Sequence, residues 1–293
     1  MRIAFFTDMF LPQVNGVVTA IVEMAKELAD LGHHVYIIAP KFSDAPEFAY
    51  PNITVKRCTS VTVPVYENIK TALFNRMILK FVRDSKIDVV HFHTPITLGL
   101  QAIMTAKILN LPLVGTFHGF FMHPEYLKHA KMNYQVIHRL AWKYSNLFYN
   151  RCDLVTCPSL GTKNELIENN CKRPILIVPY GIDLTVFDNA KARAVRKSLG
   201  GGKLVLHVGR IAHEKNIPYL LECFALAVKK VPEAKLVVVG DGPQLRNVRA
   251  KAKSLNLSGN VVFTGMMEHS KLVKSGIFAA CDIFVTASTT ETG

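Results

Sequence analysis

The sequence contains few cysteines and no cysteine motif. Its six cysteines, in 293 residues, form neither a Cys-x-x-Cys pair nor a dense framework. Because structural zinc sites and disulfide scaffolds depend on such spacings, we expect reduced, mostly buried thiols and no structural zinc.

Membrane-spanning and secretory segments are also missing from the sequence. No apolar run reaches the roughly 18 to 20 residues that a membrane-spanning helix needs. Met1-Arg2 leads directly into the strand-like residues 3–7 rather than into the apolar core of a signal peptide. The sequence therefore predicts a cytoplasmic protein.

Low-complexity sequence and internal repeats of the solenoid type are absent as well. Hydrophobic residues make up 49% of the chain and charged residues 19%, with 17 glycines and 14 prolines scattered along it. This composition excludes a disordered or collagen-like chain. The length allows one large folded domain or two of ordinary size.

Charge is the strongest compositional signal. The chain has 35 basic and 22 acidic residues, which gives a net charge of +13. Nucleic acid, an anionic membrane surface and phosphorylated substrates are all possible partners for such a chain. Nucleic acid is disfavoured, because no recognition motif accompanies the basic residues.

Hydrophobic periodicity predicts an α/β fold. Short β-branched or aromatic runs alternate with amphipathic stretches of about 10 to 18 residues, as in parallel sheets covered on both faces. In the first half we expect strands at 2–7, 34–39, 53–57, 87–92, 111–116, 153–157 and 174–179, and helices at 17–31, 96–109, 133–150 and 159–168. The pattern then restarts, with strands at 203–209, 235–240, 260–264 and 282–287, and helices at 190–199, 216–230, 243–256 and 270–280.

This restart indicates two doubly wound domains, 1–185 and 186–293. The second domain ends directly after a strand, whereas a doubly wound domain normally continues. We therefore expect the second domain to be truncated.

Gly16 lies in the loop between the first strand and the first helix. In open α/β sheets, ligands bind outside the carboxyl ends of the strands, and a glycine at a helix N-terminus lets backbone N–H groups approach a phosphate. A single glycine without the Gly-x-Gly-x-x-Gly pattern fits an ordinary turn equally well.

Two cations, Arg210 and Lys215, lie on the loop that follows strand 203–209 and precedes a helix. Fixed positive charges at a helix N-terminus suit a diphosphate. The alternative is a solvated loop with two ordinary charges. We favour phosphate binding, because the next strand also ends in a tight glycine loop, Gly240-Asp241-Gly242-Pro243, and neighbouring strand ends converge.

Three histidines lie at strand ends. His91 and His93 close one predicted strand, and His118 follows the next. No carboxylate or thiolate stands at a familiar metal-ligand spacing from them, so we expect no metal site. We expect His91 to be a packed or hydrogen-bonded strand residue, and His118, which precedes Gly119, to contact substrate.

Two basic stretches suit an anionic membrane surface. Residues 70–86 carry Arg76, Lys80 and Arg83 along one helical stripe. Residues 126–149 interleave Lys128, Lys131, Arg139 and Lys143 with Tyr134, Trp142, Tyr144, Phe148 and Tyr149. A core-packed helix with a solvated basic face explains each stretch equally well.

Several motifs, taken in order, carry a family resemblance. They are the Gly16 loop, Thr116-Phe117-His118-Gly119, Val178-Pro179-Tyr180-Gly181-Ile182-Asp183, Gly209-Arg210 with Lys215, Gly240-Asp241-Gly242-Pro243, and Ser288-Thr289-Thr290-Glu291-Thr292. Together the whole chain resembles the retaining glycosyltransferases of family 4, which have two facing Rossmann-like domains, the GT-B fold.

The resemblance implies a role for each candidate residue. Domain 1–185 would bind the acceptor and domain 186–293 the nucleotide sugar, in the crevice between them. Gly16, Arg210, Lys215 and Gly240 would hold the donor, and His118 would approach the transferred sugar. Glu291 would be the first glutamate of a Glu-x7-Glu motif that binds sugar hydroxyls, and the second would lie beyond Gly293.

Within the family, residues 92–100 and 116–127 look like the diacylglycerol glucosyltransferases. That likeness implies transfer of glucose from UDP-glucose to a lipid acceptor such as diacylglycerol, with no cofactor beyond the nucleotide-sugar substrate, by an enzyme peripheral on the inner face of the cell membrane. Departures at Pro95-Ile96-Thr97 and Gly119 leave the acceptor open. A GDP-mannose-dependent mannosyltransferase with a phospholipid or soluble acceptor, and a non-catalytic nucleotide-binding module, are the alternatives.

Overall fold

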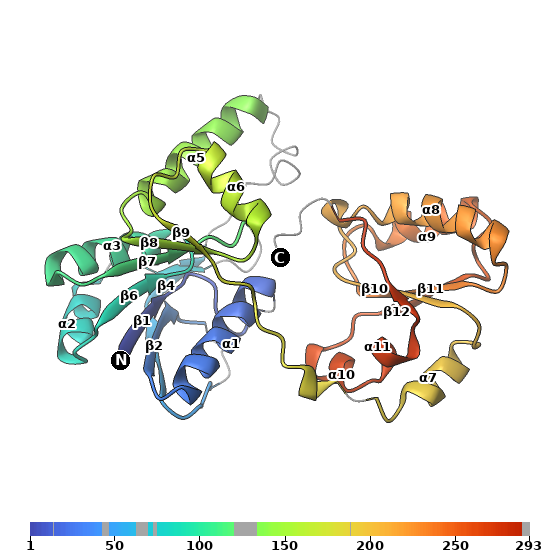
Figure 1. The fold of residues 1–293 in the computed structure, drawn as a ribbon, viewed down its shortest axis with the longest axis horizontal. Coiled ribbons are helices and arrows are strands. Elements are labelled where there is room, and N and C mark those ends of the chain that lie inside the picture. The colour runs from blue at the N-terminus through green and yellow to red at the C-terminus, as the bar shows by residue number, and fades with distance from the viewer. Residues whose placement is uncertain are drawn as a thin grey trace. The chain divides into compact units, whose positions relative to one another are not determined.

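The computed structural model describes residues 1–13, 15–42, 47–62, 70–72, 75–119, 134–187 and 189–288. The chain forms two compact units, the first ending at Gly181 and the second beginning at Ile182 (Figure 1). Both units are α/β with a parallel main sheet, so the predicted fold class is confirmed.

The first unit is built on a seven-stranded sheet. Its strands, in spatial order, are β3 (Ile53–Cys58), β2 (His34–Pro40), β1 (Arg2–Phe6), β6 (Val89–Phe92), β7 (Leu113–Thr116), β8 (Leu154–Cys157) and β9 (Ile175–Ile177). Alternate residues of β1 enter different clusters: Ile3 and Phe5 pack with helix α1, whereas Ala4 and Phe6 pack with α2, α3, α5 and α6. This alternation is why the strands read as continuous apolar runs.

The helices in the described part of the first unit are α1 (Gly16–Asp30), α2 (Arg76–Asp84), α3 (Thr97–Leu109), α5 (Tyr134–Tyr149) and α6 (Leu160–Glu168). A small antiparallel pair, β4 (Ser60–Thr62) with β5 (Lys70–Ala72), was not predicted. The helix expected within 70–86 therefore begins only at Arg76, after Asn75 caps it by accepting from the Met77 backbone N–H.

The second unit has a four-stranded parallel sheet. Its spatial order is β12 (Val261–Gly265), β11 (Lys235–Val239), β10 (Leu204–Val208) and β13 (Ile283–Phe284). Figure 1 shows α8 (Ile217–Lys230) and α9 (Leu245–Ser254) on one face, and α7 (Ala192–Ser198), α10 (His269–Val273) and α11 (Ile277–Ala280) on the other. Its described residues also form the short 3-10 helices η1 (Leu184–Val186) and η2 (His213–Lys215).

Two expectations for the second unit were wrong in detail. The single helix expected at 270–280 is split into α10 and α11, because Gly276 adopts a left-handed φ of 76° that a continuing helix cannot accommodate. The strand expected at 282–287 pairs with β10 only over Ile283 and Phe284.

Strand order places the ligand-binding edge of each unit. In the first unit β1 lies between β2 and β6, and in the second β10 lies between β11 and β13. At these points successive connections run to opposite sides of the sheet, and ligands of open α/β folds bind outside the carboxyl ends of the strands there. Among the described residues, no helix is at once long enough and apolar enough to span a membrane.

Candidate active site

A buried carboxylate organises the carboxyl ends of β1 and β6. Asp8, fully buried after β1, accepts hydrogen bonds from Thr97 Oγ1 at 2.8 Å, from Thr94 Oγ1 at 3.1 Å and from the Leu98 backbone N–H at 3.1 Å. The bond from the Leu98 N–H caps α3, whose own N-cap residue Ile96 makes no side-chain bond. Burial raises the pKa of Asp8, and these hydrogen bonds oppose that rise.

Gly16 is the first residue of α1, directly after the cap residue Asn15. A Cβ placed on Gly16 would meet no described atom within 4 Å, and its φ is not positive. The fold of this unit therefore does not itself require glycine here. The backbone N–H groups of this helix end are the ones that the sequence assigned to a phosphate.

His118 follows β7 and is 7% exposed. Its Nε2 lies 3.3 Å from His93 Nδ1, and its Nδ1 lies 2.6 Å from the Tyr180 hydroxyl. Burial lowers the pKa of His118 to about 3, so its imidazole is neutral near pH 7.

His91 is the hydrogen-bonded strand residue that the sequence predicted. It is 8% exposed on β6, and its Nε2 lies 2.6 Å from Thr116 Oγ1. Burial, and to a lesser extent His118, lowers its pKa to about 3. Among the described residues, no group of three or more His, Cys, Asp or Glu side chains could hold a metal ion.

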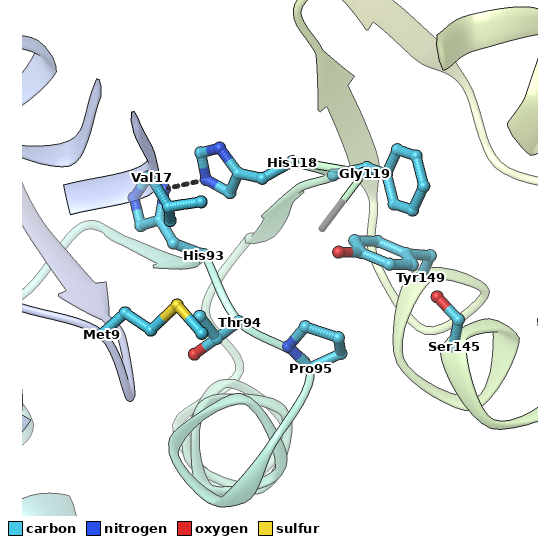
Figure 2. A pocket seen from close by; sticks show the side chains of 10 residues that line it. Met9, Val17, His93, Thr94, Pro95, His118, Gly119, Ser145 and Tyr149 are labelled. Atoms are coloured by element: carbon cyan, nitrogen blue, oxygen red, sulfur yellow. Dashed lines mark hydrogen bonds between the residues drawn. The ribbon is translucent and has the colours of Figure 1, made fainter. Parts of the chain in front are cut away.

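A pocket lies beside these histidines (Figure 2). Val17, next to Gly16, borders it together with His93 and His118, while Ser145 and Tyr149 border it from α5. The structure thus brings the first-loop helix end and His118 to one pocket. The apolar part of its lining consists of Met9, Val17, Pro95 and Phe117.

In the second unit, the loop after β10 carries both predicted cations. Arg210 donates from Nη2 to Glu214 Oε1 at 2.8 Å, and Glu214 is only 7% exposed. Lys215 closes η2, and its Cε would lie 4.0 Å from a Cβ on Gly209. Both cations therefore sit on the loop that leads into the N-terminus of α8.

Gly240 is required by the close packing of two loops. It has a φ of 143°, and a Cβ there would lie 1.9 Å from the backbone oxygen of Gly209. Gly242, with a φ of 158°, approaches the Ile211 backbone oxygen in the same way. The Gly240 loop is thus fixed against the Arg210 loop, which brings these two predicted donor residues together.

Glu291 lies outside the described residues, so its assignment stays a prediction. The described chain leading to it runs from β13 to Ser288, whose hydroxyl donates to the Glu214 backbone oxygen at 3.3 Å. The chain therefore approaches the Arg210 loop just before position 291.

The three predicted membrane cations, Arg76, Lys80 and Arg83, are exposed on α2. On α5, the aromatic residues expected at a membrane surface are mostly core: Trp142, Phe148 and Tyr149 are 5% exposed or less. The outward face of α5 carries instead Val136, Leu140, Tyr144 and Leu147, each between 46% and 57% exposed, beside exposed Arg139 and Lys143.

Sequence reasoning missed four residues that shape these sites, Asp8, Tyr149, Tyr180 and Glu214. Asp8 directly follows a strand, and Tyr180 lies inside a motif that the sequence had singled out. For Asp8, Tyr149 and Tyr180, position alone did not reveal the contacts, because their partners lie far away in the sequence. Glu214 is bonded to Arg210, only four positions away, so that spacing was a signal that could have revealed it.

Two Rossmann-like units with ligand-binding loops at their strand ends define the GT-B class of glycosyltransferases. The chain matches the model of Glycosyltransferase Family 4 over residues 14–186 and that of Glycosyl transferases group 1 over residues 188–293. The chain therefore belongs to glycosyltransferase family 4 and is a hexosyltransferase.

Several known proteins are similar to this chain over its whole length. Alpha-monoglucosyldiacylglycerol synthase of Streptococcus pneumoniae is 31% identical over 302 residues, covering 100% of this chain and 67% of that protein. A GDP-mannose-dependent alpha-mannosyltransferase of Corynebacterium glutamicum is 26% identical, covering 100% of this chain and 68% of that protein. The Anabaena protein HepE, solved with UDP and glucose, aligns with a TM-score of 0.68 at 19% identity, over 100% of this chain and 75% of that one.

Proposed function

We propose that this hexosyltransferase moves glucose from UDP-glucose to a lipid acceptor such as diacylglycerol, with retention at the anomeric carbon and no required metal ion. The observation that carries the choice of sugar and acceptor is the 31% identity, over the whole chain, to an alpha-monoglucosyldiacylglycerol synthase. The mannosyltransferase relative keeps GDP-mannose as the competing donor.

Arg210 and Lys215 hold the donor diphosphate in this proposal. Negative charge grows on the diphosphate as it leaves, and two cations next to the N-terminus of α8 stabilise that charge more in the transition state than in the ground state. The buried Glu214 holds the Arg210 guanidinium in place before the donor arrives. Gly16, at the start of α1, leaves room for the diphosphate to approach the helix N–H groups.

In this proposal His118 and Glu291 each contact the transferred sugar. His118 is neutral near pH 7, so it does not act as an acid there. Because its two ring nitrogens are bonded to Tyr180 and His93, it packs the edge of its ring against the sugar and does not bond a sugar hydroxyl. Glu291 binds sugar hydroxyls. The acceptor hydroxyl attacks from the face that the diphosphate leaves, and the proton of that hydroxyl passes to the departing phosphate oxygen.

A transfer assay tests the reaction. Radiolabelled UDP-glucose and GDP-mannose are each incubated with the protein and dioctanoylglycerol, without divalent cations. We expect labelled glycolipid from UDP-glucose. Transfer from GDP-mannose alone would overturn the assignment of UDP-glucose as the donor. If the protein binds the nucleotide but transfers no sugar from either donor, a non-catalytic binding module is favoured.

The same proposal places the first unit on an anionic membrane from the cytoplasmic side. Arg76, Lys80 and Arg83 are exposed on α2, and each exposed cation near an anionic surface contributes roughly 1 kcal/mol. The outward apolar residues of α5, with Arg139 and Lys143 beside them, suit the same surface.

Vesicle sedimentation separates this docking from a basic face that only aids solubility. Replacing Arg76, Lys80 and Arg83 together by Ser should weaken binding to phosphatidylglycerol vesicles about a hundredfold at low salt. Replacing Lys229, Lys230 and Lys253 on the second unit removes the same charge and should change binding far less. If both triple variants lose vesicle binding equally, the effect depends only on net charge and not on the α2 face.

A further inference from the structure

Tyr180, His118 and His93 form a hydrogen-bonded chain within the first unit. The Tyr180 hydroxyl lies 2.6 Å from His118 Nδ1, and His118 Nε2 lies 3.3 Å from His93 Nδ1. The rings of His118 and Tyr180 stack at 5.8 Å between centroids with an interplanar angle of 19°. His118 is therefore held in one orientation by contacts at both of its ring nitrogens.

Both histidines are neutral. Burial lowers the pKa of His118 to about 3 and that of His93 well below its usual value, and burial raises the pKa of Tyr180. Each imidazole then carries a single N–H, and the phenol keeps its proton. A neutral imidazole donates through one nitrogen and accepts through the other, so one bond direction fixes all the others in the chain.

The distances select that direction. Hydrogen bonds from O–H donors are most often about 2.7 to 2.8 Å long, whereas those from N–H donors are about 2.9 to 3.0 Å. A distance of 2.6 Å fits an O–H donor, so we assign the Tyr180 hydroxyl as the donor and His118 Nδ1 as the acceptor. His118 then donates from Nε2 to His93 Nδ1, and His93 carries its proton on Nε2.

His93 Nε2 is buried and has no hydrogen-bond partner among the described residues. His93 is 2% exposed and borders the pocket of Figure 2. Ser145, fully buried, borders the same pocket, and its hydroxyl likewise has no partner in the part of the chain that the structure describes. The free space in the pocket is only about 20 Å³, enough for one small group. Two unsatisfied polar groups beside apolar walls fit the oxygen-bearing end of an otherwise apolar ligand.

We infer that Tyr180 is a positioning residue that sets the hydrogen-bond direction through His118 to His93, and that the His93 Nε2–H binds an oxygen atom of the acceptor substrate in this pocket. An ester or hydroxyl oxygen of a glycerolipid has the required chemistry, because it accepts a hydrogen bond within an apolar framework. The assignment of the oxygen to the acceptor rests on the proposed function, whereas the direction of the chain does not.

Nitrogen NMR of the histidine rings tests the direction without any reaction. In the protein labelled with nitrogen-15 at its 11 histidines, His93→Gln and His118→Gln assign the two resonance pairs. We expect both rings as the Nε2–H tautomer, and Tyr180→Phe to remove the single tautomer at His118. Tyr144→Phe, at an exposed position on α5, is the control. An Nδ1–H tautomer at His93, or no change in Tyr180→Phe, overturns the inference.

Kinetics test the oxygen contact. With dioctanoylglycerol as acceptor, His93→Phe should raise the acceptor KM about 3- to 10-fold and leave the UDP-glucose KM unchanged, as expected for one lost neutral hydrogen bond. His93→Gln keeps an N–H donor and should recover most of the loss. An unchanged acceptor KM in His93→Phe, or equal effects of Phe and Gln, refutes the contact. If the wild-type protein glucosylates no lipid, the proposed function fails, and a titration of the His93 Nε2–H resonance with dioctanoylglycerol decides the contact: a shift supports it and no shift refutes it.

Discussion

Acid should destabilise the first unit through its buried neutral histidines. Burial lowers the pKa of both His91 and His118 from 6.5 to about 3. Between these values the unfolded chain binds a proton at each histidine that the folded unit does not. The contribution of these histidines to the free energy of unfolding is therefore fully present above pH 6.5, and it is lost as the pH drops below that value.

The size of the effect follows from the shift. At pH 5, each histidine costs about 2 kcal/mol of the free energy of unfolding, so the two together cost about 4 kcal/mol. His93 acts in the same direction. Asp8 acts in the opposite direction just above pH 3.8, because burial raises its pKa and the folded unit protonates first. Since whole domains are stable by roughly 5 to 15 kcal/mol, a loss of this size is readily measured.

The assay uses the single tryptophan of the chain. Trp142 is 3% exposed in the core of the first unit, so its fluorescence during urea unfolding reports on that unit. His91→Gln can keep a hydrogen-bonding group near Thr116 and should reduce the pH slope by about 1.4 kcal/mol per pH unit. His213→Gln, exposed in the second unit, is the control. An equal free energy of unfolding at pH 7 and pH 5 would refute the conclusion that the buried histidines are neutral in the folded unit.

Two glycine substitutions should separate fold from function. Gly240→Ala places a Cβ against the Gly209 backbone and should destabilise the second unit by on the order of 3 kcal/mol, as measured by circular dichroism during urea unfolding. The control is Gly259→Ala, whose Cβ meets nothing within 4 Å and which should change stability by less than about 0.5 kcal/mol. Equal effects of the two substitutions would contradict the close packing of the Gly240 and Gly209 loops. Gly16→Ala should leave the Trp142 transition unchanged but weaken UDP-glucose binding in calorimetry, and unchanged binding would remove Gly16 from the proposed donor site.

The sequence predicted the layered fold because the central strands of both sheets are buried on both faces. The strands β1, β2, β10 and β11 are apolar runs for that reason. The ends of β1, β7, β10 and β11 were located closely enough to find the loops of Gly16, His118, Arg210 and Gly240. Periodicity could not separate the short strand β5 from helix α2, because a three-residue strand carries too little pattern.

Side-chain contacts between residues far apart in the chain could not be predicted from the sequence. Asp8 and Thr94 are 86 positions apart, and His118 and Tyr180 are 62 apart, so only the order of the strands in the sheet brings them together. For the same reason the sequence identified the aromatic residues of α5 but not the side of the helix that packs on the sheet, which buries Trp142 and Tyr149 and leaves Tyr144 exposed.

The most direct test of the donor site is calorimetric titration of UDP-glucose into the wild-type protein, Arg210→Ala and Arg246→Ala. Arg246 is exposed on α9 and matches Arg210 in charge. Loss of one charge-assisted contact costs about 1.5 to 3 kcal/mol, so Arg210→Ala should weaken binding about 10- to 150-fold while Arg246→Ala binds as the wild type does. Equal affinity of wild type and Arg210→Ala would contradict the account.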